Sequence, residues 1–473
     1  MSEISSLAPQ NVWQIFDFIC SIPHISGHET RLAEKLTALA REAGLSVLRD
    51  DTGNLIIEKP AAAGWENAPR IILQAHMDMV PASDRDFDFL NTPITPVIDG
   101  DYVRACGTTL GSDDGIGVAL ALSVILDREF HCGALTVILT VDEEVGLGGA
   151  RGISPEHLKG RYLINLDGSD DGFCIGCAGG CRQSFTFRST FSQTFSGIPV
   201  QITLSGLPGG HSGLCIHENR GNALKFMAEF VDQQPELQLF SFDGGKADNA
   251  IPDSAQVKGV YNGTVADLQK SADAFCLILK NELPPAVTPE IKVELTAAPQ
   301  VIWDKTFRQN LLNALILVPN GALDFDDELQ IVKTSSNLAA IETTPEKVII
   351  KTSQRSLSDE CRDNISAAVK THFELFHAVG ETGNVYPATT PATDSTLLKT
   401  AIACARELNR PDRAYAIHAG LESGWFSAKN PDLEIISCGP EHYDFHTPYE
   451  KLNIASVGKA DHFLRTIICK LGR

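Results

Sequence analysis

An apolar segment that runs directly into three consecutive acids constrains the fold of this chain more than any other feature. Residues 135–141 have the β-branched and apolar character of a buried strand, and Asp142, Glu143 and Glu144 follow at once, ahead of glycines. Carboxylates at the end of a core strand are costly unless a cation or hydrogen-bond donors compensate them. Successive side chains of an extended segment point in opposite directions, so Glu143 and Glu144 can serve a metal and a water respectively or the reverse. A solvated turn is the alternative interpretation.

Two further apolar segments end in the same way. Residues 70–80 have the pattern of a buried strand that ends in His76 and Asp78, which share one face at a period of two. The carboxylate could therefore orient an imidazole that binds a metal, although a single histidine on a strand is more often a core residue. Residues 161–166 form a third such segment, and Asp167 follows it. In open α/β sheets ligands bind outside the carboxyl ends of the strands, so these groups are expected at one rim.

Two loops add candidate ligands to this rim. The glycine-rich segment 109–117 carries Asp113 and Asp114 ahead of an apolar helix, where an acid can also act as a simple helix cap. His446 lies near the end of the chain, beyond a strand expected at 433–437, and supplies a second nitrogen ligand. The candidate metal ligands are His76, Asp113, Glu144, Asp167 and His446. This set exceeds the needs of one zinc ion and suits two divalent ions that share a bridging carboxylate and a water.

Composition limits the remaining functions. A chain of 473 residues exceeds one compact core, so at least two domains are expected. Its 39 basic and 60 acidic residues give a net charge of −21, which opposes binding to nucleic acid or to an anionic membrane. The N-terminal residues lack the pattern of a secretory signal, and no segment approaches 18 continuous apolar residues, so a cytoplasmic location is expected.

The 12 cysteines have no regular spacing and are typical of buried, reduced thiols. Cys174, Cys177 and Cys181 form one cluster that could indicate a zinc or iron–sulfur site. No fourth cysteine or histidine lies at ligand spacing, and the glycines around the cluster are typical of a strand edge and turn.

The character of the chain changes twice. Residues 1–185 have α/β character, residues 186–384 alternate between strands and helices in two similar halves, and α/β character returns at 385–473. We therefore expect a catalytic domain in two parts, separated by an inserted α+β domain with two lobes.

Seven ordered motifs carry a resemblance that spans essentially the whole chain. They are Ala75-His-Met-Asp-Met-Val80, Gly111-Ser-Asp-Asp-Gly-Ile-Gly117, Thr140-Val-Asp-Glu-Glu-Val-Gly146, Asn165-Leu-Asp167, Gly209-Gly-His-Ser-Gly213, Ile417-His-Ala-Gly-Leu-Glu422 and His446-Thr-Pro448. With these motifs the chain resembles the zinc-dependent exopeptidases that include the carnosinases, tripeptidase and glutamate carboxypeptidase. The resemblance is strongest to bacterial dipeptidases that act on Xaa-His.

The resemblance implies an α/β fold with a mixed sheet covered by helices and an inserted two-lobed α+β lid. It implies two Zn²⁺ ions, for which Co²⁺ or Mn²⁺ could substitute. One ion would be held by His76, Asp113 and Asp167, and the other by Asp113, Glu144 and His446. Asp113 would bridge the ions, Asp78 would orient His76, and Glu143 would act as general base on a metal-activated water.

The resemblance also assigns the substrate to the lid. His211 would stabilise the oxyanion, and Asn249, Arg355 and backbone near Gly420 would bind the carboxylate of a dipeptide, with Arg355 as its bidentate partner. Dipeptides, including Xaa-His, would fit between this clamp and the metals, and closure of the lid would be required for catalysis. A homodimer through the lid is a further expectation.

Two departures and two other functions remain open. Asp114 stands where Asn is expected in relatives, and Gly168-Ser-Asp170-Asp171 follows Asp167 where Glu is expected. Extra negative charge there would change metal preference or favour a cationic substrate terminus. An amidohydrolase or N-acyl amino acid deacylase would use the same site, and a silent metal-binding scaffold is the alternative outside the enzymes.

Overall fold

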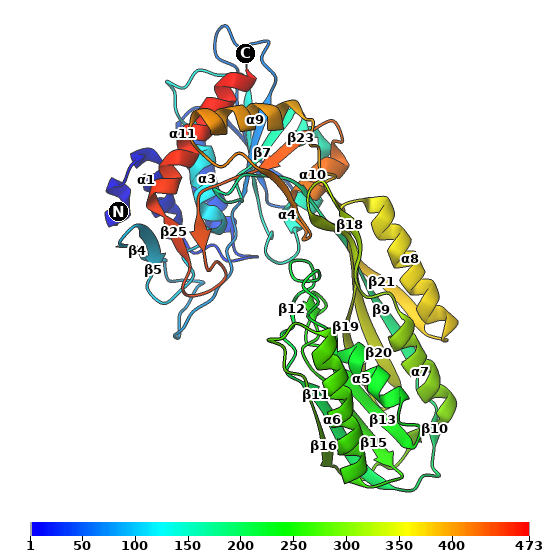
Figure 1. Cartoon of the computed structure of the whole chain (residues 1–473). Helices are drawn as coiled ribbons and strands as arrows, with labels where there is room; N and C mark the ends of the chain where they lie inside the picture. Colours follow the sequence, from blue (N-terminus) through cyan, green and yellow to red (C-terminus); the bar gives the residue numbers. More distant parts are fainter. Residues whose placement is uncertain (1, 473) are drawn as a thin grey trace. The chain divides into compact units, whose positions relative to one another are not determined.

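The computed structural model describes residues 2–472, which form two compact units (Figure 1). Unit 1 comprises Met1–Cys177, Thr389–Ala416 and Leu421–Arg473, and unit 2 comprises Ala178–Ala388 and Ile417–Gly420. Unit 2 begins earlier than the expected residue 186 because strand β9, Gly179–Arg188, belongs to it as a whole. The segment 417–420 also belongs to unit 2, since the Ala178 N–H donates to the carbonyls of Ile417 and Ala419, at 3.1 and 3.0 Å.

The main sheet of unit 1 has eight strands in the order β1-β2-β6-β3-β7-β23-β8-β22. These strands are β1 (Ser46–Arg49), β2 (Leu55–Lys59), β6 (Leu135–Thr140), β3 (Ile71–His76), β7 (Tyr162–Asn165), β23 (Glu434–Ser437), β8 (Phe173–Cys177) and β22 (Ala414–Ile417). Four neighbours, β6, β3, β7 and β23, run parallel. Every residue of β3, β6 and β7 is buried, as apolar strands covered on both faces require.

The helices of unit 1 cover this sheet. They are η1 (Glu3–Ser6), α1 (Gln10–Cys20), α2 (Thr30–Glu42), α3 (Ser112–Ile125), α4 (Gly148–Gly152), η2 (Pro155–Leu158), α9 (Thr396–Glu407), α10 (Ser423–Lys429) and α11 (Ile454–Leu471). Helix α3 is buried at every residue from Asp114 to Ile125, which fits its nearly uniform apolar sequence. Gly115 allows α1 to approach closely, because a Cβ there would lie 3.2 Å from the ring of Phe16.

A second, four-stranded sheet in unit 1 joins two distant parts of the chain. Its order is β24-β25-β5-β4, formed by β24 (His442–Tyr443), β25 (Lys451–Asn453), β5 (Tyr102–Ala105) and β4 (Pro96–Asp99). The loop with His446 connects β24 to β25, and β5 leads into the loop with Asp113. The antiparallel register places Lys451 opposite Arg104. This small sheet therefore brings the two loops to the same region of unit 1.

Unit 2 is built on a nine-stranded sheet with the path β16-β11-β15-β13-β19-β20-β9-β21, from which β18 pairs with β19. Besides β9, its strands are β11 (Ile198–Ser205), β13 (Leu237–Gly244), β15 (Ala255–Tyr261), β16 (Glu290–Leu295), β18 (Gly321–Asp326), β19 (Ile331–Thr343), β20 (Lys347–Ser356) and β21 (Val379–Tyr386). The short strands β10 (Phe191–Ser192) and β17 (Ile302–Trp303) pair, as do β12 (Gly210–His211) and β14 (Ala250–Ile251).

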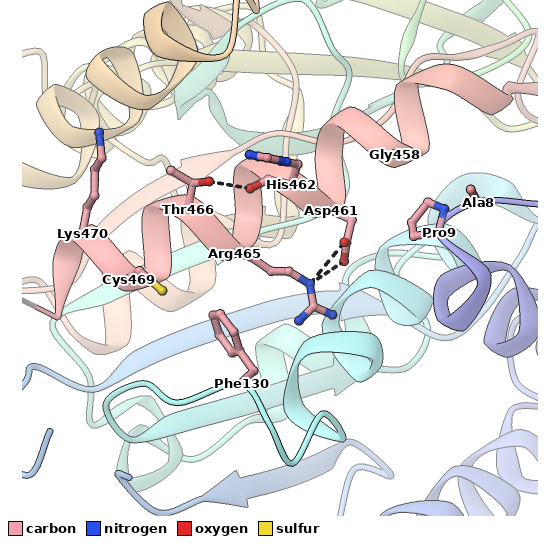
Figure 2. A pocket seen from close by; sticks show the side chains of 10 residues that line it. All are labelled: Ala8, Pro9, Phe130, Gly458, Asp461, His462, Arg465, Thr466, Cys469 and Lys470. Atoms are coloured by element: carbon pink, nitrogen blue, oxygen red, sulfur yellow. Dashed lines mark hydrogen bonds and ion pairs between the residues drawn. The ribbon is translucent and has the colours of Figure 1, made fainter. Parts of the chain in front are cut away.

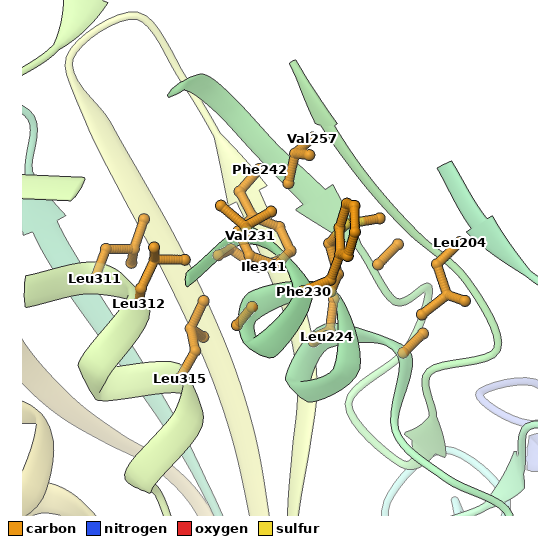
Figure 3. Packing of buried hydrophobic residues seen from close by; sticks show 14 of the residues in the cluster. Leu204, Leu224, Phe230, Val231, Phe242, Val257, Leu311, Leu312, Leu315 and Ile341 are labelled. Carbon is orange, nitrogen blue, oxygen red and sulfur yellow. The ribbon is translucent and has the colours of Figure 1, made fainter. Parts of the chain in front are cut away.

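The helices of unit 2 are α5 (Ala223–Asp232), α6 (Val265–Glu282), α7 (Lys305–Leu317) and α8 (Asp359–Leu375). Helices α5 and α7 pack side chains such as Phe230 and Leu311 against Phe242 and Val257 of the sheet (Figure 3). Strands β13 and β19 pair at Gly244 and Ile341, where the two halves of the sheet join.

Unit 1 also contains a cavity of about 680 Å³ beside helix α11 (Figure 2). Arg465 and Asp461 of α11 line it together with Phe130, and none of its lining residues is a candidate ligand of the rim. Within residues 2–472, no helix combines the length and the apolar character needed to cross a membrane.

Candidate metal centre and carboxylate site

The candidate ligands of the rim come from strand ends and two loops of unit 1. His76 is the last residue of β3, Asp167 lies two residues beyond β7, and Glu144 lies four residues beyond β6. Because these three strands are parallel neighbours, their carboxyl ends meet at one edge of the sheet. Asp113 and His446 are brought to this edge by the loops that the small sheet connects.

The five candidate ligands form two groups that share Asp113. His76, Asp113 and Asp167 form one group, and Asp113, Glu144 and His446 form the other, with the ligand atoms of each group within 4.8 Å of one another. Asp113 Oδ1 lies 3.1 Å from His76 Nε2, and Asp113 Oδ2 lies 3.2 Å from His446 Nε2. His446 Nε2 also contacts Glu144 Oε1 at 2.8 Å. The two oxygens of Asp113 are thus divided between the groups, as a bridging carboxylate requires.

The carboxylates gathered at the rim shift the pKa values of their neighbours. Hydrogen bonds to Asp113 and Glu144 raise the pKa of His446 to about 10. Burial favours neutral His76, yet the hydrogen bond to Asp113 and the nearby Asp78 carboxylate raise its pKa well above the usual value. Burial and the charge of Asp113 raise the pKa of Asp167 to about 6. These shifts reflect several acids crowded beside two imidazoles, and two divalent cations would compensate the negative charge through the same donors.

The acidic triplet after β6 is anchored through its backbone. The N–H groups of Asp142, Glu143 and Glu144 donate respectively to Glu29 Oε1 at 3.1 Å, to Asp78 Oδ1 at 3.0 Å and to Asp78 Oδ2 at 3.2 Å. Ser26 donates a further hydrogen bond to Asp78 at 2.8 Å. Three consecutive donors are thereby satisfied by buried carboxylates, which leaves the Glu143 and Glu144 side chains available at the rim.

The position of Asp78 differs from the expectation in one respect. His76 Nδ1 lies 2.9 Å from the backbone carbonyl of Asp78 and 3.5 Å from its carboxylate. The carbonyl is therefore the hydrogen-bond partner of the imidazole, and the carboxylate contributes mainly charge. A single residue thus links His76 to the Glu143–Glu144 backbone.

Glu143 lies beside both groups, since its carboxylate clusters with His76 and Glu144. Burial raises its pKa well above the usual value, and the charge of Asp167 acts in the same direction against His76. A carboxylate with a raised pKa is a stronger base than an ordinary carboxylate, as a general base requires.

Asp114, Asp170 and Asp171, the acids at which this sequence departs from the pattern expected in relatives, each have a partner in the structure. Asp114 is 1% exposed and accepts the backbone N–H of His76 at 3.2 Å, and burial raises its pKa well above the usual value. Asp170 pairs with Arg410 in a buried ion pair at 2.7 Å, and Asp171 pairs with Arg413. The charges of Asp170 and Asp171 are thus compensated by arginines.

In unit 2, His211 is held as a hydrogen-bond donor. Its Nδ1 accepts the backbone N–H groups of Gly213 and Leu214, at 3.2 and 3.1 Å, so the neutral imidazole carries its proton on Nε2. Burial and the charge of Arg355 lower the pKa of His211 to about 4. Asn249 is adjacent, because its carbonyl accepts the N–H of Ser212 at 2.8 Å.

Arg355, in β20, is 5% exposed and donates to the Tyr386 hydroxyl at 2.6 Å. Its Nε has no hydrogen-bond partner, and no carboxylate of residues 2–472 lies within ion-pair distance of its guanidinium. Gly420 packs on Tyr386, since a Cβ there would lie 2.6 Å from the ring. A buried guanidinium without a counterion is costly, so this position suits an anionic ligand.

Several residues around these sites had no assigned role in the sequence. Burial raises the pKa of Glu422 to about 7, and its Oε2 accepts hydrogen bonds from Gln74 and Thr140 at 2.6 and 2.8 Å. His418 contacts Ser335 at 2.7 Å in unit 2. The motif Ile417–Glu422 contained both His418 and Glu422, but spacing alone could not reveal their partners.

Comparisons with known proteins cover both units. A family model described as Peptidase family M20/M25/M40 matches residues 72–470. The cytosol non-specific dipeptidase of Escherichia coli (strain K12) is 38% identical, with 97% of each chain covered. The crystal structure of aminoacylhistidine dipeptidase from Vibrio alginolyticus has a TM-score of 0.90 at 38% identity and covers 99% of this chain and 98% of that chain. The aminopeptidase PepT from Bacillus cereus ATCC 10987, with a TM-score of 0.58 at 17% identity, covers 99% of this chain and 100% of that chain and shares the fold alone. The fold class expected from the sequence is confirmed.

Proposed function

This chain belongs to peptidase family M20/M25/M40, and we propose that it is a metal-dependent dipeptidase that hydrolyses Xaa-His and related dipeptides. The names of the two relatives at 38% identity support a dipeptide substrate. The observation that carries the proposal is the division of the Asp113 oxygens between two groups of ligands.

The donor set supports two zinc ions as the resident metals. His76, Asp113 and Asp167 would hold one ion, and Asp113, Glu144 and His446 would hold the other. Imidazole and carboxylate donors suit zinc, and Co²⁺ or Mn²⁺ could occupy the same donors. When bound, such ions polarise a carbonyl and lower the pKa of a coordinated water to about 7.

The side chains of the protein supply the proton transfers and the substrate contacts. We assign Glu143 as the general base that takes the proton of the attacking water and gives it to the leaving amine. Asp78 would support Glu143 by holding its backbone N–H. His211 would donate from Nε2 to the developing oxyanion, for which its neutral tautomer is suited.

Arg355 supports specificity for a free carboxylate. Its buried guanidinium lacks a carboxylate partner within residues 2–472, and its planar donors match a carboxylate in bidentate geometry. We propose Arg355 as the main partner of the C-terminal carboxylate of the substrate, with Asn249 and the backbone near Gly420 as further contacts.

One experiment tests this function directly. Purified protein is analysed for metal content and then offered Xaa-His and other dipeptides, the same dipeptides with amidated C-termini, and N-acyl amino acids. We expect about two metal ions per chain and hydrolysis of dipeptides with a free carboxylate. Preferential hydrolysis of N-acyl amino acids would instead indicate the deacylase alternative, and full activity in a chelator would contradict the metal-dependent mechanism.

The assembly and location are part of the same proposal. We propose a homodimer through the lid and a cytoplasmic location, in line with the name of the relative from Escherichia coli. Light scattering on the purified protein and on a variant with an altered surface of unit 2, the proposed lid, tests the homodimer. Cell fractionation tests the cytoplasmic location.

A further inference from the structure

Glu450 is a buried acid whose carboxylate accepts hydrogen bonds from residues 110–113, the segment that ends in the candidate ligand Asp113. Glu450 is 2% exposed. Its Oε2 accepts the backbone N–H groups of Leu110 and Gly111, at 2.8 and 3.1 Å. Its Oε1 accepts the N–H and the hydroxyl of Ser112, at 2.7 and 2.6 Å, and the N–H of Asp113 at 3.3 Å. One carboxylate therefore accepts five hydrogen bonds from four consecutive residues.

These contacts join two loops that are far apart in the sequence. Glu450 and Asp113 are 337 positions apart, and Glu450 lies four residues beyond His446 and directly before β25. Strand β25 pairs with β5, which leads into the loop with Asp113. The loop of His446 and the loop of Asp113 are therefore joined twice, by the pairing of β25 with β5 and by the hydrogen bonds of the Glu450 carboxylate.

The backbone that Glu450 holds is not a regular helix start. Asp113 and Asp114 have non-helical dihedral angles within the first turn of α3, and Gly111 has a φ of 72°. A Cβ at Gly111 would lie 2.9 Å from Met79 Sδ, so the loop is also closely packed. Hydrogen bonds to an ionised carboxylate are strong, and five of them can hold a conformation that the chain would otherwise leave.

We propose that Glu450 is the positioning residue for Asp113. By holding residues 110–113, it directs one oxygen of the bridging aspartate toward His76 and the other toward His446. The proposal rests on the proposed function, because Asp113 matters in this way only if the rim binds two cations. A simple helix cap is the alternative role, in which Glu450 stabilises α3 without any effect on the ligands.

The test compares Glu450→Gln with a matched capping variant. Glutamine keeps the shape of the side chain but replaces one acceptor oxygen with a donor amide that faces backbone N–H groups. Glu434→Gln is the control, since Glu434 Oε2 accepts the Leu397 N–H at 2.7 Å at the start of α9 in the same unit. Metal titration, hydrogen exchange of the metal-free protein over residues 110–113, and dipeptide kinetics are measured for both.

We expect Glu450→Gln to weaken metal binding about 10- to 100-fold, as loss of an outer hydrogen-bond partner of a ligand does. Exchange at 110–113 should be faster even without metal, and kcat should fall more than KM rises. Glu434→Gln should lower thermal stability without these effects. If both variants lose stability alike while Glu450→Gln keeps wild-type metal affinity and exchange, Glu450 is only a cap and the proposal is overturned.

A milder variant keeps the test decisive if Glu450→Gln does not fold. Ser112→Ala removes the 2.6 Å hydroxyl contact and leaves the carboxylate and the backbone intact. It should shift metal affinity and exchange in the same direction by a smaller factor, and unchanged values would count against the proposal. The wild-type protein is measured in parallel, so a failure of the proposed function appears as absence of metal binding or hydrolysis in the wild type.

Discussion

The three acids at residues 142–144 occupy one turn, yet the structure gives each a different environment. Asp142 has a φ of 54° and its N–H is held by Glu29. Glu144 contacts His446, and the half-buried Glu143 carboxyl has a raised pKa. The segment is a turn and not an extended strand, so the alternation expected from the sequence does not apply, and the carboxylates of Glu29 and Asp78 fix the three environments by holding the backbone donors.

Glu143→Gln should leave metal binding intact and reduce kcat by about 10²- to 10⁴-fold, because the amide cannot accept a proton. Glutamine preserves the size of the side chain, so the ligand groups around Asp113 should remain in place. The measurement is steady-state hydrolysis of a dipeptide together with metal content per chain. An unchanged kcat would remove Glu143 as the base, and a loss of metal would show that it acts as a ligand.

Arg355→Ala should chiefly raise KM for dipeptides with a free C-terminus, with a smaller effect on kcat. Arg355→Lys should recover only part of the loss, because an ammonium lacks the planar pair of donors. Kinetics on free and amidated dipeptides provide the measurement. Arg182→Ala is the control, since Arg182 of the same sheet already pairs with Asp248 at 3.1 Å. Equal hydrolysis of amidated dipeptides by the native protein would contradict a carboxylate clamp.

At the residue scale, the sequence predicts side chains that occur in short motifs with recognisable chemistry. The sequence predicts five ligands on this basis, and the structure brings their ligand atoms into two groups: His76, Asp113, Glu144, Asp167 and His446. Glu450 and Tyr386 belong to no such motif, because Glu450 binds backbone N–H groups and Tyr386 binds another side chain, both far along the chain. No local pattern encodes such a partner.

At the scale of elements, apolar periodicity predicted the amphipathic helices well. Apolar residues recur at helical spacing along 10–21 and 359–376, and the structure has α1 and α8 at these positions. The apolar pattern after segment 109–117 predicts a helix from Val118, but α3 begins at Ser112, since glycines and acids conceal its first turn. The sequence pattern of α6 does not indicate an amphipathic helix, because the apolar Leu277 and Ile278 lie on its exposed side.

The turn between β7 and β8 carries Asp167 and depends on one buried ion pair. Arg410→Ala would leave the Asp170 carboxylate buried and unpaired, which costs about 3–5 kcal/mol in stability. The turn has little freedom to adapt, because a Cβ at Gly168 would already lie 2.8 Å from Cys438. We therefore expect a lower melting temperature and weaker metal binding together, measured by calorimetry and metal titration.

Arg413→Ala is the matched control for this prediction. It breaks the neighbouring pair with Asp171, whose side chains are 64% and 45% exposed, so the expected loss is about 0–1 kcal/mol. Similar losses in both variants would show that the buried pair does not fix the turn.

At the scale of the whole molecule, the change in sequence pattern near residue 186 does not coincide with the start of unit 2 at Ala178. Strand β9 crosses the expected boundary because it continues directly from the end of β8 with a single residue, Ala178, between them. The segment 417–420 is assigned to unit 2 by hydrogen bonds to Ala178, which sequence spacing does not reveal.

The excess of acids makes the stability of the metal-free protein depend on pH in a definite direction. Hydrogen bonds to Asp113 and Glu144 raise the pKa of His446 to about 10 in the folded protein, against about 6.5 in an unfolded chain. The folded state therefore binds this proton more tightly, and the stabilisation is complete below pH 6.5 and lost as pH rises toward 10. The lowered pKa of Asp113 acts only in acid, outside this window.

We accordingly expect the melting temperature of the chelator-treated protein to fall between pH 6.5 and 10. His446→Gln should show a shallower fall, because it lacks the titrating group while keeping a similar volume. Metal should reverse the trend, since cations replace the protons on the histidines and bind more tightly as pH rises. Thermal scans with and without zinc across this range provide the measurement. A metal-free melting temperature that stays constant or rises would mean that the protonated histidines do not hold the acids of the rim together.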